Sequence, residues 1–131
     1  MKKDLLNIFP AFLLLNIVFC GTAFSKNDDL LGKWKGEDGH TIILICRSDS
    51  LYYGKIAQLK DIKALDVKEG AMILKGFAYD NEKHVWTNGQ VYAPKRHAFY
   101  DGTIKMVDRN TISITAHAGL FYKSTTWKRV E

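Results

Sequence analysis

Residues 97–117 read HAFYDGTIKMVDRNTISITAH, and this stretch decides the fold class. On either side of the polar centre Asp108-Arg109-Asn110, apolar or small side chains alternate with polar or charged ones, as in strands with one wet face. The side chains predicted to point inward are Tyr100, Gly102, Ile104, Met106, Ile112, Ile114 and Ala116. Two such strands joined by a short polar turn predict an antiparallel hairpin.

The rest of the chain repeats this organisation on both sides of the hairpin. Short apolar runs and turn signals follow one another at a spacing of about ten residues, which predicts an all-β meander closed into a barrel or stacked as a sandwich. The predicted strands are Leu31–Gly36, His40–Arg47, Leu51–Leu59, Ala71–Tyr79, Lys83–Thr87, Gln90–Ala93, His97–Val107, Thr111–His117 and Phe121–Val130. Asp38-Gly39 and Asn88-Gly89 are expected to be hairpin turns, and Asp101-Gly102 a bulge. Lys60–Glu69 is expected to be a loop with one helical turn.

The first residues have the pattern of an export signal. Lys2 and Lys3 precede the apolar run Leu5–Phe19, which is short for a membrane span of about 20 residues. Ala23-Phe24-Ser25 offers small residues at the positions that a signal peptidase reads. We therefore predict a signal peptide over residues 1–25, cleavage between Ser25 and Lys26, and one domain over residues 26–131. The alternative is an uncleaved anchor.

Two cysteines bear on the location of the protein. Cys20 follows the apolar run and is a candidate for lipid attachment, although the bulky Phe19 before it argues against this. Cleavage after Ser25 would leave Cys46 as the one cysteine of the exported chain, so no internal disulfide is expected. Since Cys46 ends the apolar run that begins at Ile42, we expect it to be a small buried hydrophobic residue. The predicted location is the periplasm or the cell surface.

Composition excludes several classes of protein. The chain has 131 residues, 47% of them hydrophobic, and a net charge of +5, which fit one folded domain and not a disordered chain. The sequence pI of about 9.2 invites the hypothesis of nucleic-acid binding. However, the basic residues are dispersed, with Lys95-Arg96-His97 as the only dense patch, so a nucleic-acid partner is not expected.

Motifs for catalysis or metal binding are missing from the sequence. His40, His84, His97 and His117 show no metal-ligand spacing. The chain has no G-x-S-x-G motif or phosphate loop, and its acidic residues gather at predicted turns. We therefore expect no enzyme, no cofactor and no metal. The sequence does not indicate an oligomeric state.

From Gly32 onward the sequence resembles the DUF2147 family of small exported bacterial proteins. The resemblance rests on Gly32-Lys33-Trp34, on residues 70–77 (GAMILKGF), on W-x-x-G-x-x-Y-x-P over Trp86–Pro94, on Tyr100–Ile104 and on the terminal W-x-R-V over Trp127–Val130. It implies an antiparallel meander closed into a calycin-like (lipocalin-like) barrel of about eight or nine strands. The chain is a divergent member, because Ala93, Ala116 and His117 stand where many relatives carry Asp, Arg and Gly.

The calycin resemblance implies a closed and an open end of the barrel. Trp34 would lie at the closed end with Arg129 packed across its ring, and we assign Trp34, Trp127 and Arg129 to the closure of the barrel. The candidate ligand-binding residues are the aromatics Trp86, Tyr92, Tyr100 and Phe121. A pocket would open opposite Trp34, near the loop at Ala93–Ala98, but the short chain favours a filled interior over a cavity.

Two functions remain as hypotheses. The first is an exported, non-catalytic barrel that binds a small, partly apolar ligand. The alternative is an envelope protein with a filled core that acts structurally or through interactions of its surface.

Overall fold

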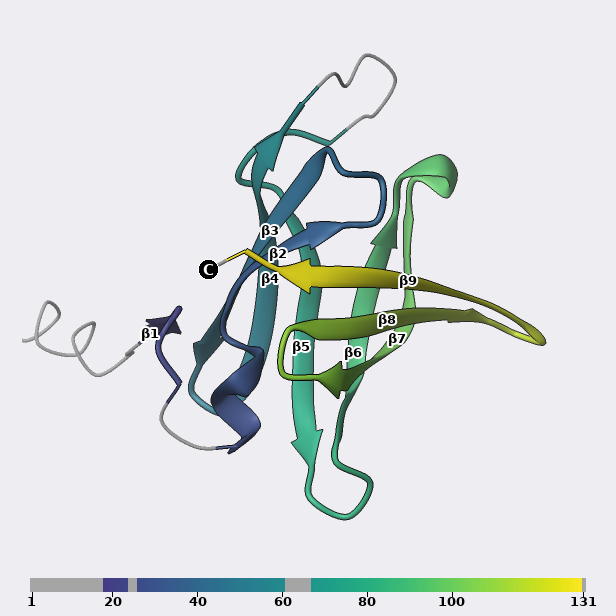
Figure 1. The fold of residues 1–131 in the computed structure, drawn as a ribbon. Coiled ribbons are helices and arrows are strands. Elements are labelled where there is room, and N and C mark those ends of the chain that lie inside the picture. The colour runs from purple at the N-terminus through teal and green to yellow at the C-terminus, as the bar shows by residue number, and fades with distance from the viewer. Residues whose placement is uncertain (1–17, 24–25, 61–66, 131) are drawn as a thin grey trace, which may run out of the picture.

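The computed structural model describes residues 18–23, 26–60 and 67–130. These ranges contain nine strands and two short 3-10 helices (Figure 1). The strands are β1 (Val18–Cys20), β2 (Gly32–Gly36), β3 (Thr41–Ser48), β4 (Leu51–Leu59), β5 (Met72–Asp80), β6 (Val85–Ala93), β7 (Ala98–Asp108), β8 (Thr111–Ala118) and β9 (Phe121–Arg129). The helices are η1 (Lys26–Leu30) and η2 (Pro94–Arg96). The predicted loop helix at Asp61 falls outside the described residues.

Strands β2 to β9 form a closed barrel. Each pairs antiparallel with the next along the chain, and β9 returns to β2, where Arg129 lies opposite Trp34. Strand β1 is additional: it pairs with β3 beyond the end of β2, on the same edge. The all-β class, the antiparallel meander and the closed eight-strand barrel of the sequence prediction are confirmed. The more specific prediction, that the barrel is calycin-like, stays a prediction.

Antiparallel order sends successive turns to opposite ends of the barrel (Figure 1). We call one the η1 end; it holds η1 and the turns at residues 49–50, 81–84 and 109–110. We call the other the η2 end; it holds η2 and the turns at residues 37–40 and 119–120. Each strand therefore runs from one end of the barrel to the other, and its inward side chains contribute to the interior at both ends.

The core is built from the inward face of nearly every strand. The fully or almost fully buried apolar residues are Leu30, Leu31, Trp34, Ile43, Ile45, Tyr52, Ile56, Leu74, Phe77, Trp86, Ile104, Ile112 and Ile114. The alternation read from the sequence places Ile104, Ile112 and Ile114 correctly. Because these side chains remove apolar surface from water, they supply the main stabilisation of the barrel.

The predicted hairpin turn at Asn88-Gly89 is wrong. Strand β6 runs unbroken through both residues, with Asn88 at a φ of 63° and a register shift against β7 between Trp86 and Gly89. The turn signal marks a bulge that bends the strand. Gly89 is required there because a Cβ would overlap the ring of Phe77.

The bulge expected at Asp101-Gly102 is also absent, since both residues stay in regular register with β8. Gly102 has a packing reason instead: a Cβ at this position would overlap the side chain of Val91. The hairpin turn predicted at Asp38-Gly39 is present, because these residues lie in the β2–β3 turn. That turn spans residues 37–40 and is longer than the expected two residues.

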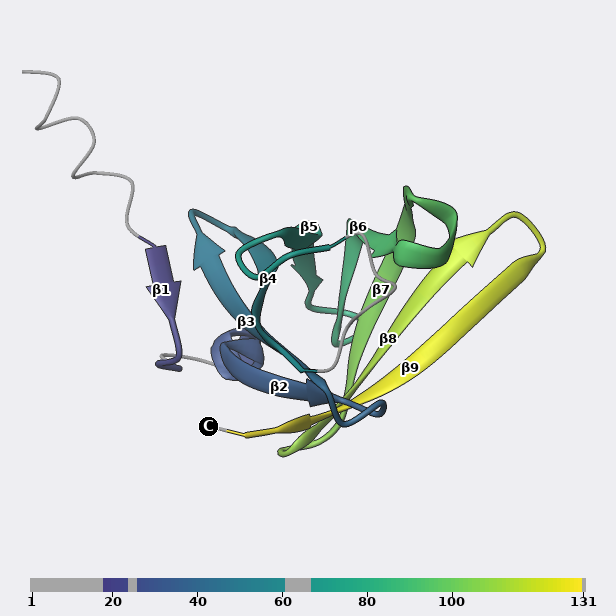
Figure 2. The same cartoon turned by 90° about the horizontal axis from the view of Figure 1, so that it is seen from above.

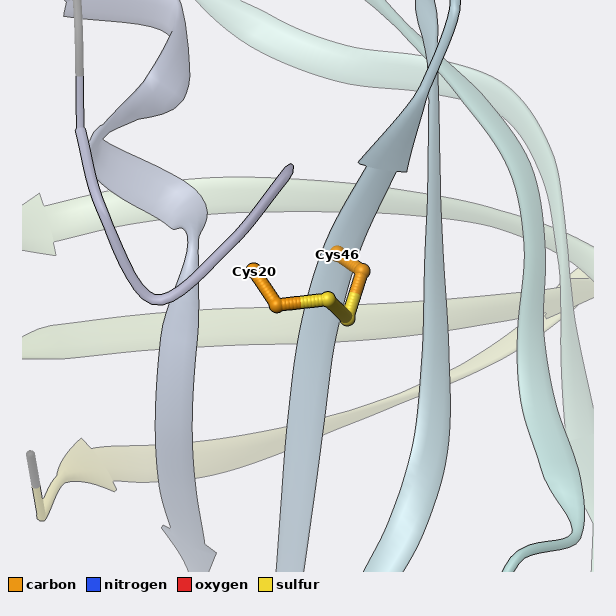
Figure 3. Close-up of a disulfide and its surroundings, with 2 residues drawn as sticks. All are labelled: Cys20 and Cys46. Atoms are coloured by element: carbon orange, nitrogen blue, oxygen red, sulfur yellow. A yellow bond between two sulfur atoms is a disulfide. The ribbon is translucent and has the colours of Figure 1, made fainter. Parts of the chain in front are cut away.

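The expectation for the cysteines is overturned by a disulfide between Cys20 and Cys46 (Figure 3). The two residues are directly opposite in the β1–β3 register, with Cα atoms 4.2 Å apart. Cys46 is thus a disulfide partner and not merely a small hydrophobic residue. The sulfur of Cys20, bonded to Cys46, is not available for a lipid thioether in this state.

Cleavage between Ser25 and Lys26 stays a prediction, and Ser25 lies outside the described residues. A chain that began at Lys26 would lack Cys20 and therefore this disulfide. Across residues 18–23, 26–60 and 67–130, no helix has the length and apolar character needed to cross a membrane.

Candidate functional site

The η1 end of the barrel is closed by the chain segment that precedes β2. Leu30 and Leu31 insert into the core and are almost fully buried. Two indoles bond to the backbone of the segment: Trp34 Nε1 donates to the Leu30 carbonyl at 3.0 Å, and Trp86 Nε1 donates to the Asn27 carbonyl at 3.2 Å. The segment therefore acts as a plug, and its backbone carbonyls accept hydrogen bonds from the two buried indole N–H groups.

Arg129 locks this plug from the last strand. Its guanidinium carbon lies 4.2 Å from the centroid of the Trp34 ring. The same group donates to the Leu31 carbonyl at 3.0 Å and to the Asp29 carbonyl at 2.6 Å. A cation over an indole contributes about 0.5–2 kcal/mol, depending on desolvation. Trp34 and Arg129, which the sequence analysis assigned to closure, thus lie together at the η1 end of the barrel.

A buried ion pair, which the sequence analysis missed, joins the plug to strand β3. The Asp28 carboxylate is fully buried and accepts two bonds from Arg47 Nη1, both at 2.7 Å, and one from the Tyr52 hydroxyl at 2.7 Å. Burial, reinforced by the bond to Asp28, raises the pKa of Tyr52. Arg47 also stacks on the ring of Phe19, 4.5 Å away, so β1 covers the pair. In the sequence, Asp28 looked like an ordinary acidic turn residue.

The η2 end of the barrel contains a cavity of about 630 Å³. Its wall is mainly apolar and comes from strands on both sides of the barrel, with η2 and the β8–β9 turn at the margin. The apolar lining residues are Ile56, Leu59, Val67, Ile73, Leu74, Val91, Ala93, Pro94, Ile114, Ala116, Ala118, Phe121 and Trp127. The filled interior favoured by the chain length is therefore not what the structure shows.

Three of the four predicted ligand-binding residues line this cavity: Tyr92, Tyr100 and Phe121. The fourth, Trp86, is buried in the core beside the plug and does not contribute to the lining. Trp127, assigned from the sequence to closure, is instead half-buried in the cavity wall, where its Nε1 donates to Thr125 Oγ1 at 2.9 Å. The depth of a side chain along the barrel depends on strand tilt, which the sequence pattern does not give.

The mouth of the cavity carries an excess of positive charge. Among the described residues, Lys95 and Arg96 of η2 and Lys123 of β9 line it, against one carboxylate, Asp38. That carboxylate is engaged by its own turn, accepting bonds from the His40 and Thr41 N–H groups at 2.8 and 3.1 Å. Partial burial raises the pKa of Asp38, but these bonds outweigh it and the net pKa is lowered. The described lining therefore combines three cations with a carboxylate that is already hydrogen-bonded.

The part of the chain that the structure describes contains no group of three or more His, Cys, Asp or Glu side chains placed to hold a metal ion. The titratable groups that line the cavity are Asp38, Tyr92, Lys95, Arg96, Tyr100, Tyr122 and Lys123. This set offers hydroxyl donors and cations around an apolar space. Such a lining suits the orientation of a bound molecule.

The fold and the cavity define a class: a closed antiparallel barrel, plugged at one end and hollow at the other. The chain belongs to the DUF2147 family, since the family model described as "Uncharacterized protein conserved in bacteria (DUF2147)" matches residues 32–129. The resemblance drawn from the sequence is confirmed. No curated protein and no solved structure matches the chain. A bacterial family together with a disulfide suggests a protein outside the reducing cytoplasm.

Proposed function

We propose that this protein is exported to the periplasm or the cell surface and binds one small, partly apolar molecule in the cavity at its η2 end, without catalysis. The observation that carries the proposal is the cavity itself. Its volume of about 630 Å³ falls within the range typical of small-molecule sites. An eight-strand barrel is just wide enough to hold one such ligand, so a hollow interior is a departure from simple close packing.

The chemistry of the lining supports a ligand with an apolar body and a polar end. Ile73, Val91 and Ile114 offer an apolar surface, and Tyr100 supplies a hydroxyl within it. Apolar walls with a few polar groups are the usual composition of a ligand pocket, where the walls give affinity and the polar groups give orientation. The cavity favours this function over the alternative of a filled-core envelope protein.

Absence of catalysis is part of the proposal because the lining groups are poorly arranged for acid–base work. Asp38, the lining carboxylate, hydrogen-bonds the backbone of its turn and the Thr41 hydroxyl, which donates to it at 2.9 Å. A general base must reach a substrate proton, and this carboxylate is already committed.

The test is uptake of a ligand by the full protein and its loss when the cavity is filled. Native mass spectrometry of protein purified from its own envelope should show an extra mass that leaves on denaturation. The fluorescent probe 1-anilinonaphthalene-8-sulfonate, which has an apolar aromatic body and one negative charge, should compete with that ligand. Ala116→Phe places a ring in the cavity and should weaken probe binding at least about tenfold, a change worth about 1.4 kcal/mol.

Ser113→Phe is the matched control, because Ser113 lies on the same strand but outside the cavity lining. It should leave probe affinity within about twofold of the parent. A bare native mass together with no probe uptake would refute the proposal. Equal probe binding by the parent and the Ala116→Phe variant would also refute it, since the probe would then bind elsewhere.

A further inference from the structure

The tip of the β8–β9 hairpin exposes three consecutive apolar side chains to solvent. The exposed fractions are 97% for Leu120, 80% for Phe121 and 72% for Tyr122. Gly119, with a φ of 64°, makes the turn that presents them. Turn residues are usually polar or glycine, so a run of three large apolar side chains at a tip is a feature without a role in the barrel core.

The hairpin projects away from the body of the barrel. In both views of the ribbon its tip reaches past the neighbouring strands, on the same side of the molecule as η2 (Figures 1 and 2). Phe121 and Tyr122 nevertheless line the cavity as well. The apolar tip and the cavity mouth therefore form one continuous surface.

Three basic residues belong to the surface that includes this apolar tip. Lys123 follows it directly in the chain, and Lys95 and Arg96 share the cavity margin with it. From Ala118 to Ser124 the hairpin tip carries no acidic residue. Apolar and aromatic side chains flanked by lysine and arginine are typical of segments that enter the interface of an anionic bilayer.

We propose that the β8–β9 tip docks the barrel on the surface of an anionic lipid bilayer. Leu120, Phe121 and Tyr122 enter the interface, while Lys95, Arg96 and Lys123 contact lipid headgroups. A second copy of the chain fits the tip less well, because pairing two tips would bring their cations together. Docking in this orientation places the mouth of the cavity against the lipid, so an apolar molecule could pass between them without crossing water.

The docking does not depend on the proposed ligand function, and it is measured separately. The full protein is incubated with vesicles of phosphatidylethanolamine and phosphatidylglycerol, and the bound fraction is measured by flotation. We expect binding that falls with added salt and is weaker on phosphatidylcholine vesicles, because screening and the loss of anionic lipid both remove the electrostatic attraction. The double variant Leu120→Ser/Phe121→Ser should bind at least about tenfold more weakly.

Val107→Ser is the matched control. Val107 is an exposed apolar side chain, 61% accessible, near the β7–β8 turn at the η1 end. Its replacement should leave vesicle binding unchanged. A parent protein that does not float with anionic vesicles would overturn the proposal, as would an equal loss of binding in the Val107→Ser variant. A dimer that dissociates in the tip variant, without vesicle binding by the parent, would assign the tip to a second copy instead.

Discussion

Cys20 and Cys46 are bonded across the β1–β3 pair, at a sequence separation of 26 residues. The bond closes a loop that contains η1, the segment that plugs the barrel. Arg47, next to Cys46, holds Asp28 inside that loop. The disulfide, the ion pair and the plug therefore form one connected structure at the η1 end. Removing Cys20 would remove the covalent link, while the bonds from Trp34, Trp86 and Arg129 to the plug would remain.

The first prediction concerns the thiols of the exported protein. If the exported chain retains Cys20, protein isolated under thiol-blocking conditions should show no free thiol before reduction and two after it. Alkylation followed by mass spectrometry gives both the thiol count and the first residue of the chain. A chain that starts at Lys26 with one free thiol would instead confirm the cleavage site predicted from the sequence and exclude the disulfide from the exported form.

The second prediction concerns the buried carboxylate of Asp28. Asp28→Ala should lower the free energy of unfolding by about 3 kcal/mol, because it leaves Arg47 and the Tyr52 hydroxyl without their partner. Urea denaturation followed by circular dichroism measures the change. Asp29→Ala removes the same charge from an exposed neighbour and should cost less than about 1 kcal/mol. Equal losses in the two variants would contradict a special role of Asp28.

The third prediction concerns stability at alkaline pH. The pKa of Tyr52 in the folded protein is raised above its ordinary value of 10.0, so the folded state keeps this proton when the unfolded state has lost it. The stabilisation is fully present below about pH 10 and is lost as the pH rises further, since the unfolded state then binds fewer protons.

Urea denaturation of the parent and of Tyr52→Phe, repeated at rising pH, measures this contribution. Although Tyr52→Phe also loses the bond to Asp28, its free energy of unfolding should fall less steeply above about pH 10 than that of the parent. Parallel pH profiles of the two proteins would show that Tyr52 ionises as it does in the unfolded chain.

The fourth prediction separates two tryptophans that look alike in the sequence. Trp34→Ala should cost about 3–5 kcal/mol, because Trp34 is fully buried under Arg129. Trp127→Ala should cost less, about 1–2 kcal/mol, because its half-buried indole lines a cavity. Thermal and urea denaturation of the two variants measure which one loses more unfolding free energy. A larger loss of unfolding free energy for Trp127→Ala than for Trp34→Ala would mean that Trp127 is packed in the core and does not line the cavity.

The position of Trp127 in the cavity wall also has an optical consequence. Ligand binding in the cavity should change the fluorescence of Trp127, which lies in the cavity wall. A Trp127→Phe variant should therefore lose most of the ligand-induced change in intrinsic fluorescence while still binding the probe. Retention of the full change would mean that the ligand contacts a different tryptophan.

Alternation along the chain was enough to predict seven of the strands nearly as they are and the inward face of β7 and β8. The failures came where local signals have more than one structural meaning. Asn88-Gly89 reads as a turn, yet the same positive φ that suits a turn also suits a bulge inside β6. Only the neighbouring strands decide which of the two forms.

The residues of the candidate site could likewise be predicted only in part from the sequence. The sequence pointed to Tyr92, Tyr100 and Phe121 as aromatic residues able to line a pocket, and these three do line the cavity. It assigned Trp86 to ligand binding and Trp127 to closure, whereas Trp86 is buried in the core and Trp127 lines the cavity. The sequence pattern does not give the depth of a side chain along the barrel axis. That depth depends on strand tilt and register across the closed sheet.

The sequence by itself determined the β class, the order of the strands, the family and the aromatic set from which the site is drawn. The β class and the strand order follow from period-two patterning and turn residues, which act over a few positions, whereas the family follows from the resemblance of its motifs. The tertiary structure alone decided the Cys20–Cys46 bond, the burial of Asp28 between Arg47 and Tyr52, and the division of the interior into a plugged end and a hollow one. Each of these results depends on bringing residues far apart in the chain into contact, and packing between distant strands is not encoded in any short stretch of residues.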